Sequence, residues 1–148
     1  MCLSIVYTKE EFEEEFGEVP KYGWKIFDFD PKTEEITPFF YHEAGIPIPR
    51  KVEIDEKPYR EDKDRETITS ATKKSVKVEY PTGFHIFLYE EDAEAVCSFH
   101  DGQSNTHTIL PIKLGKILAY GIEWKFCDNG TRSVVVCKTM TVEEKLCV

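Results

Sequence analysis

The sequence predicts a single α+β domain, residues 1–148, built on a mostly antiparallel, twisted sheet with two short helices near residues 9–16 and 90–98. Three observations lead to this prediction. A chain of 148 residues has the usual size of one domain. Short apolar runs separated by turn residues recur along most of it, as in sheets. Clear helix signals occur at only two places.

The first helix has the clearest local signals. Thr8 and Glu11 have the spacing of a capping box, in which each side chain bonds a free backbone N–H of the first turn. Phe12 and Phe16 follow four residues apart, on one side of a helix. Gly17 then provides a natural end.

Alternating and aromatic segments indicate the strands. Residues 22–30 and 36–42 flank turn residues at 30–33 and predict a β-hairpin. Both of its faces carry aromatic residues, so we expect part of the sheet to be covered on both sides. Residues 1–7 fit either a strand or an extended leader.

Further strands are predicted in the second half of the chain. Asn129-Gly130 is a strong signal for a tight hairpin between neighbouring strands. Pro111 and Gly115 break an apolar run that fits one or two strands. The predicted segments are 76–80, 82–89, 109–121, 123–126, 133–138 and an edge strand within 139–148.

Residues 45–66 differ from the rest of the chain. Three prolines interrupt any regular element, and thirteen of the seventeen residues from 50 to 66 are charged. We interpret this segment as a charged, mobile, solvent-exposed excursion. The alternative is a flap over residues 83–95.

The overall charge limits the classes of partner. A net charge of −9 argues against direct nucleic-acid binding, which needs clustered lysine and arginine. The acidic residues form either an ordinary solvated surface or one that binds a basic groove of another protein.

The five cysteines show no close pairing and no secretory signal precedes them, so we expect reduced thiols in a cytoplasmic protein. No apolar run approaches the roughly 18 residues that span a membrane.

The cysteines and histidines fit either a metal site or, for the thiols, a structural role. Cys97, His100 and His107, completed by His85 or Cys127, would supply four zinc ligands. Their spacing matches no known zinc framework, and Cys97 continues an apolar helix face. We therefore expect a buried structural thiol, no metal and no cofactor.

The strand after Gly83 holds the main candidate site. Because side chains alternate along a strand, His85, Phe87 and Tyr89 share one face. If this face lines a cleft, the three residues would bind a ligand, and His85 would be a catalytic acid or base. If it faces the core, His85 is a structural histidine. The opposite face carries Phe84, Ile86 and Leu88.

Two stretches carry a resemblance to known proteins. Met1-Cys2-Leu3 at the start, and Gly83-Phe84-His85-Ile86-Phe87 before the acidic segment Glu90-Glu91-Asp92-Ala93, resemble a group of short phage and bacterial proteins of uncharacterised function. This resemblance implies an accessory role in a phage or mobile-element context.

The same strand is similar to the Gly-x-Tyr strand of ADP-ribosyltransferase-like folds. The similarity implies that His85 replaces the nicotinamide-stacking tyrosine, that Ala93 and Ala95 are the small helix residues, and that Glu123 is the candidate catalytic glutamate. No histidine or arginine lies within residues 22–30, where such enzymes hold the cofactor. The resemblance therefore implies an altered active site.

Two functions follow as expectations. The first is a non-enzymatic cytoplasmic accessory protein that binds a protein partner. The alternative is a nucleotide- or dinucleotide-binding protein or enzyme with an ADP-ribosyltransferase-like fold and an altered active site. A deep cleft beside His85 would favour the alternative, and a filled face would favour protein binding.

Overall fold

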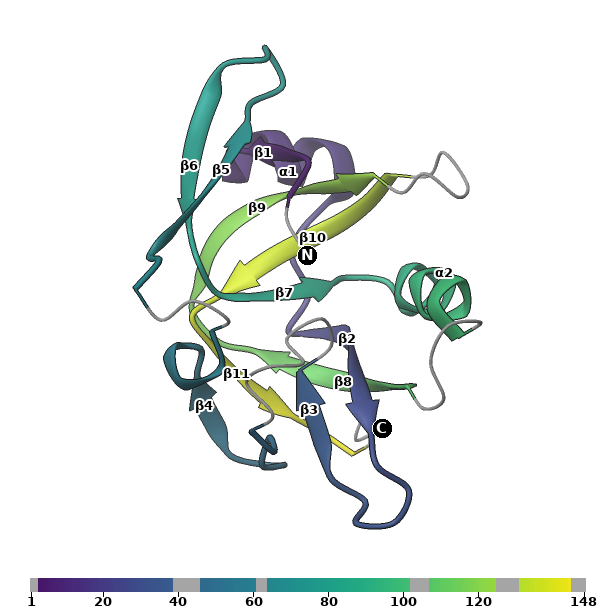
Figure 1. Ribbon diagram of the computed structural model, residues 1–148. Coiled ribbons are helices and arrows are strands. Elements are labelled where there is room, and N and C mark those ends of the chain that lie inside the picture. Colours follow the sequence, from purple (N-terminus) through teal and green to yellow (C-terminus); the bar gives the residue numbers. More distant parts are fainter. Residues whose placement is uncertain (1–2, 39–45, 61–63, 102–106, 125–130, 145–148) are drawn as a thin grey trace.

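The computed structural model describes residues 3–38, 46–60, 64–101, 107–124 and 131–144, with backbone alone for residues 98–101 (Figure 1). Within these residues, neither helix has the length and apolar character needed to cross a membrane. The predicted α+β class is confirmed, with a mostly antiparallel sheet and two α-helices.

Nine antiparallel strands form the main sheet in the described part of the chain. Eight follow one path, and the ninth, β3 (Ile36–Pro38), pairs with β2. The order along the path is β1 (Ile5–Tyr7), β9 (Ile117–Trp124), β10 (Thr131–Cys137), β7 (Phe84–Phe87), β2 (Tyr22–Phe29), β8 (His107–Leu114), β11 (Thr139–Val142) and β4 (Glu53–Asp55).

The main sheet bends sharply where β8 passes into β9 and β10 passes into β11. Strand β8 runs into β9 through Gly115 and Lys116, and β10 runs into β11 through Lys138. The register of the β9–β10 pair shifts close by, between Val136 and Cys137. A side chain at Gly115 would collide with Thr139, so glycine permits the close approach at this bend. The bend sends β9 and β10 to the upper part of Figure 1 and β8 and β11 to the lower part.

Strands β7 and β2 occupy the middle of the bent sheet. Each is well paired on its outer side, β7 with β10 and β2 with β8. Between them a single residue pair, Trp24 with Phe87, joins the strands, and beyond it they separate. The centre of the sheet therefore contains a place where the main-chain ladder stops.

The first helix, α1, spans Lys9–Phe16, and these are the bounds that the sequence predicted. Both capping-box bonds are present, Glu11 N–H to Thr8 Oγ1 at 3.1 Å and Thr8 N–H to Glu11 Oε1 at 2.9 Å. Phe12 is fully buried and packs against the rings of Tyr7, Phe16 and Tyr120. The aromatic side of α1 thus fixes the helix on the molecule.

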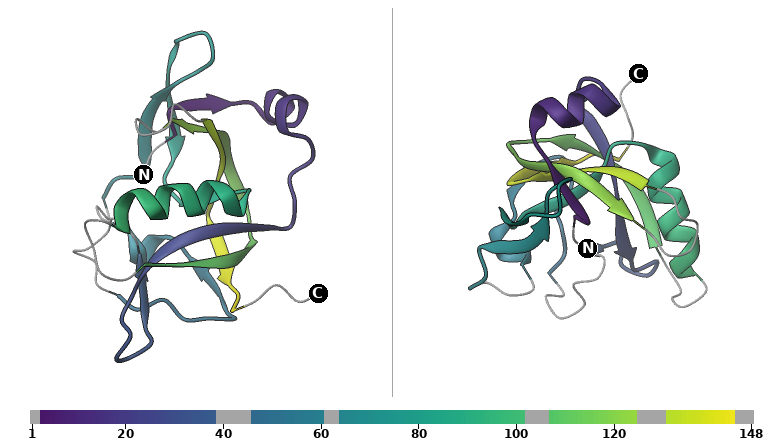
Figure 2. Two further views of the ribbon diagram at one scale, coloured as in Figure 1. Left: turned by 90° about the vertical axis from the view of Figure 1, so that its right-hand side faces the viewer. Right: turned by 90° about the horizontal axis from the view of Figure 1, so that it is seen from above.

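The second helix, α2 (Glu90–Asp101), extends three residues past the predicted end at 98. It lies across one face of the sheet (Figure 2) and buries Ala93, Val96 and Cys97 there. A second, larger core fills the opposite face. The prediction that the sheet is covered on both sides is therefore confirmed.

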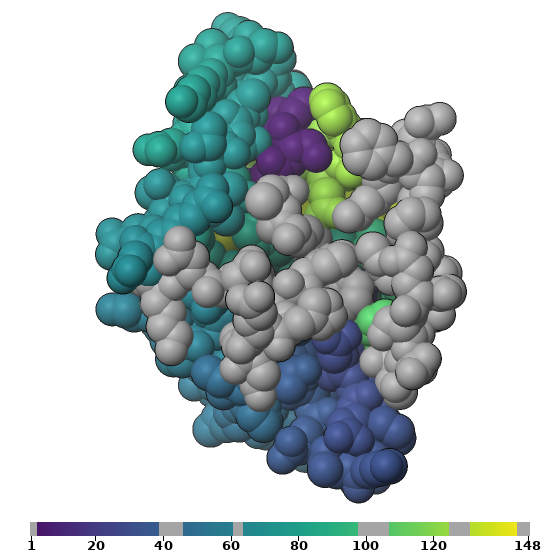
Figure 3. Space-filling model, viewed as in Figure 1, coloured from purple at the N-terminus to yellow at the C-terminus, as the bar shows by residue number. Residues whose placement is uncertain are grey.

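Strands β5 (Thr67–Ala71) and β6 (Lys77–Pro81) form a separate two-stranded hairpin that projects from the body of the molecule (Figures 1 and 3). The sequence indicated β6 but not β5. The hairpin lies beside β1 through one parallel bridge, Val6 with Thr72.

The interpretation of residues 45–66 as lacking regular structure is wrong for the described part. Strand β4 and a short 3₁₀ helix, η1 (Lys57–Tyr59), lie within it, and Ile48 is buried. Pro58 stands at the start of η1, where its missing N–H is not needed. Because β4 pairs with β11, the predicted edge strand at 139–148 is not at the edge.

The predicted hairpin at 22–42 and the predicted strands within 109–138 are present where the structure describes them. Strands β2 and β3 form the predicted hairpin, and the run at 109–121 divides into two strands, β8 and β9. Strands β9 and β10 pair as expected, although the Asn129-Gly130 turn lies outside the described residues.

Candidate functional site

The three residues of the predicted ligand-binding face are not all together. Phe87 belongs to the core beneath α2, and His85, 2 % exposed, points to the same face. Tyr89 lies beyond the end of β7 and is 46 % exposed. The opposite face carries Phe84, Ile86 and Leu88 in the other core, so the predicted alternation along β7 is confirmed.

The ring of His85 is hydrogen-bonded at both nitrogens. Its Nε2 lies 3.0 Å from Tyr80 Oη, and its Nδ1 lies 3.2 Å from Gly83 O. The Leu3 N–H donates to the same Tyr80 oxygen at 2.8 Å. Since the Gly83 carbonyl only accepts, Nδ1 carries the proton, and the Tyr80 hydroxyl donates to Nε2. In the neutral imidazole these bonds leave Nε2 without a proton, as an acceptor.

The surroundings of His85 also disfavour its charged form. Burial, followed by the nearby positive charge of Lys25, lowers the pKa of His85 to about 3. At neutral pH the ring therefore carries no positive charge. In this arrangement it links the beginning of the chain at Leu3 and strand β6 at Tyr80 to strand β7.

Lys25 on β2 is a buried cation that contacts His85. Its side chain is 6 % exposed and its Nζ donates a hydrogen bond of 2.8 Å to the His85 carbonyl oxygen. Burial lowers the pKa of Lys25 to about 8, while the negative charge of Glu123 acts in the opposite direction. The ammonium lies where β2 and β7 have separated.

Glu123 and Arg132 are two further buried residues of charged type. They are direct neighbours across the β9–β10 ladder, and each is 3 % exposed. Glu123 is the residue that the ADP-ribosyltransferase resemblance implied as a catalytic glutamate. The structure places it inside the protein opposite an arginine, which the sequence did not single out.

Two of the described cysteines, Cys97 and Cys137, are buried. Cys137 is fully buried, and this burial raises the pKa of its thiol to about 12. Cys97 is buried on the core side of α2, as its place on an apolar helix face predicted.

Two of the histidines considered as zinc ligands, His85 and His107, contact other residues in the structure. His107 Nε2 lies 3.2 Å from Asp28 Oδ1, and His85 bonds Tyr80 and Gly83. The His100 side chain and Cys127 lie outside the description. Within the described residues, no three histidine, cysteine or acidic side chains are grouped to hold a metal ion.

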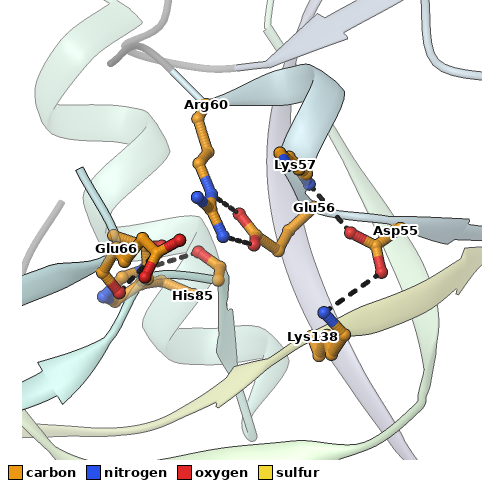
Figure 4. A network of polar contacts seen from close by, with 9 residues as sticks. Asp55, Glu56, Lys57, Arg60, Glu66, His85 and Lys138 are labelled. Atoms are coloured by element: carbon orange, nitrogen blue, oxygen red, sulfur yellow. Dashed lines mark hydrogen bonds and ion pairs between the residues drawn. The ribbon is translucent and has the colours of Figure 1, made fainter. Parts of the chain in front are cut away.

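A further polar network lies beside the bend of the sheet. The buried carboxylate of Glu56 accepts two hydrogen bonds from Arg60, the one from Nε at 2.6 Å (Figure 4). Glu56 N–H bonds Lys138 O at 3.0 Å, and Lys138 Nζ lies 3.5 Å from Asp55. The network attaches η1 to the junction of β10 and β11, which is a structural role.

The outer side of α1 is an acidic surface. Glu10, Glu14 and Glu15 are exposed there, while Glu11 and Glu13 are half-buried. The first turn of α2 carries a second acidic group of side chains.

Comparison with family models, with curated proteins and with solved structures finds no match to this chain.

Proposed function

We propose that the protein binds a basic surface of another protein, with the outer side of α1 as the main contact. The observation that carries this proposal is the fixed array of carboxylates on α1. The helix carries five glutamates, Glu10, Glu11, Glu13, Glu14 and Glu15, and its single basic residue, Lys9, stands at its start with its Nζ 3.8 Å from Glu13.

The helix presents these charges from a rigid support. Its opposite side is held by Phe12, which is fully buried, and by ring contacts of Phe16 with Tyr7. A partner therefore meets carboxylates whose backbone positions are already set, and less conformational entropy is lost on binding.

The net charge of −9 also attracts a basic partner before the two surfaces touch. Complementary charge accelerates encounter and selects partners by sign, and both effects weaken as salt increases. The resemblance at Met1-Cys2-Leu3 and Gly83–Phe87 leads us to place this role in a bacterial cytoplasm, as a phage or mobile-element accessory protein.

The nucleotide-binding alternative receives less support from the geometry. A base or nicotinamide ring would have to reach His85, whose ring is buried and bonded to Tyr80 and Gly83. A thermal-shift screen with nucleotides and dinucleotides addresses it directly, because a ligand well above its Kd raises the unfolding temperature.

The test of protein binding uses two variants of equal net charge. Glu10→Gln with Glu14→Gln alters α1, and Glu34→Gln with Glu35→Gln removes two exposed carboxylates from the β2–β3 turn. Each is used to capture proteins from a bacterial extract, and the captured protein is then purified and titrated by calorimetry. We expect the α1 variant to bind about threefold to tenfold more weakly than the control.

Two results would contradict the proposal. One is equal affinity of the α1 variant and the control for the captured protein. The other is an affinity that does not fall between low and high salt, because an electrostatic contact is screened.

A further inference from the structure

The tip of the β5–β6 hairpin is a small basic group beside the acidic helix. The hairpin is not part of the nine-stranded sheet. Besides the Val6–Thr72 bridge, Ser70 Oγ donates to Leu3 O at 2.7 Å and lies 3.3 Å from Ser4 O. These contacts hold strand β5 along β1, which leads directly into α1.

This placement brings two tip lysines to one end of α1. The Nζ of Lys73 lies 4.9 Å from the centre of the Tyr7 ring, a cation–π contact. The pKa of Glu11 is lowered first by its bonds to Thr8 and additionally by the charges of Lys73 and Lys74. Both lysines are exposed, so the contact is one that another cation can replace.

We infer that the hairpin tip is an internal competitor for the acidic surface of α1. Lys73 and Lys74 occupy the end of the surface next to Tyr7, and a basic partner gains full access only when it displaces them. This inference rests on the proposed function of α1 as a binding surface.

The same contact indicates what the partner presents. The hairpin offers two adjacent cations, one of which lies against an aromatic ring. A partner segment with neighbouring lysine or arginine side chains would reproduce both interactions, and arginine would also stack on Tyr7.

The first experiment measures the internal contact without any partner. The carboxyl pKa of Glu11 is followed by NMR in Lys73→Gln with Lys74→Gln, and in the control Lys113→Gln with Lys116→Gln. Both variants carry the same net charge, and the control lysines are exposed near the β8–β9 bend. We expect the Glu11 pKa to rise in the tip variant only. An unchanged pKa in the tip variant would overturn the inference.

The second experiment uses a hexalysine peptide as the probe, with the amide shifts of α1 as the readout. We expect the tip variant to bind the peptide roughly threefold or more tightly than the control at low salt, because the internal lysines no longer compete. Equal affinities, or no shift of α1 in the tip variant, would overturn the competition. If the proposed function itself is wrong, the Glu10→Gln, Glu14→Gln variant will bind the captured partner as well as its control does.

Discussion

Lys25 and His85 are joined where the two central strands separate, with Lys25 Nζ donating to the His85 carbonyl oxygen at 2.8 Å. Beyond the Trp24–Phe87 pair, β2 no longer pairs with β7, and a long side chain supplies the donor. Buried carbonyl groups need such partners, because an unsatisfied one costs free energy. The bond therefore connects the two halves of the bent sheet.

Replacing Lys25 by methionine should lower the free energy of unfolding by about 1–3 kcal/mol, because the His85 carbonyl loses its donor while the volume is nearly kept. Urea denaturation measures the change. Lys21→Met, at an exposed position, is the control and should stay within about 0.5 kcal/mol of wild type. A Lys25→Met protein as stable as the control would show that the bond contributes nothing.

Replacing Tyr80 by phenylalanine should destabilise the protein by about 1–2 kcal/mol, since Leu3 N–H and His85 Nε2 both bond the removed hydroxyl. Hydrogen exchange should also show faster exchange at the Leu3 amide. Tyr22→Phe changes a partly exposed ring in the same way and serves as the comparison. Equal stability of the two variants would contradict the assigned bonds.

The packing around Gly83 leaves no room for a side chain. A Cβ atom there would lie 2.7 Å from Cys137 O and 2.8 Å from Val136 Cγ1. Gly83→Ala should therefore lower stability by about 1–3 kcal/mol, as expected for an overpacked site. Thermal unfolding monitored by circular dichroism checks this, and an unchanged midpoint would show that β7 and β10 can move apart freely.

The sequence predicted the parts of the fold whose causes are local. Thr8, Glu11 and Phe12 define α1 through contacts within one or two turns, so the helix bounds were correct. The alternation along β7 was equally local. Strands β4 and β5 were not predicted, because β4 is stabilised by pairing with β11, far along the chain.

The candidate site was predicted in part, for the same reason. His85 could be singled out, but its bond to Leu3 through Tyr80 depends on the folded path of the chain. Burial of Lys25 runs against the usual exposure of lysine, and no pattern signalled it. The pairing of β9 with β10 was predicted, whereas its register, with Trp124 opposite Thr131, was not.

Cys137 should resist alkylation in the folded protein. Its thiol is buried and its pKa is raised to about 12, so hardly any thiolate forms at pH 8. Treatment with iodoacetamide and peptide mass spectrometry should find this cysteine unmodified in native protein and modified in urea. Rapid native modification would mean that the bend near Gly115 opens readily.

The stability of the protein should depend on pH through His85. Its pKa is about 3 in the folded state and near 6.5 when unfolded, so the unfolded chain binds more protons between these values. Stability should therefore be fully present above pH 6.5 and fall as the pH decreases, by about 1.4 kcal/mol per pH unit for one proton. Urea titrations of wild type and His85→Gln between pH 5.0 and 6.5 isolate this effect, since most carboxyl groups titrate lower. The variant should be less stable at pH 7 but show a slope smaller by about one proton. Identical slopes would mean that His85 becomes protonated in the folded protein, and that its ring is accessible to water or to a ligand after all.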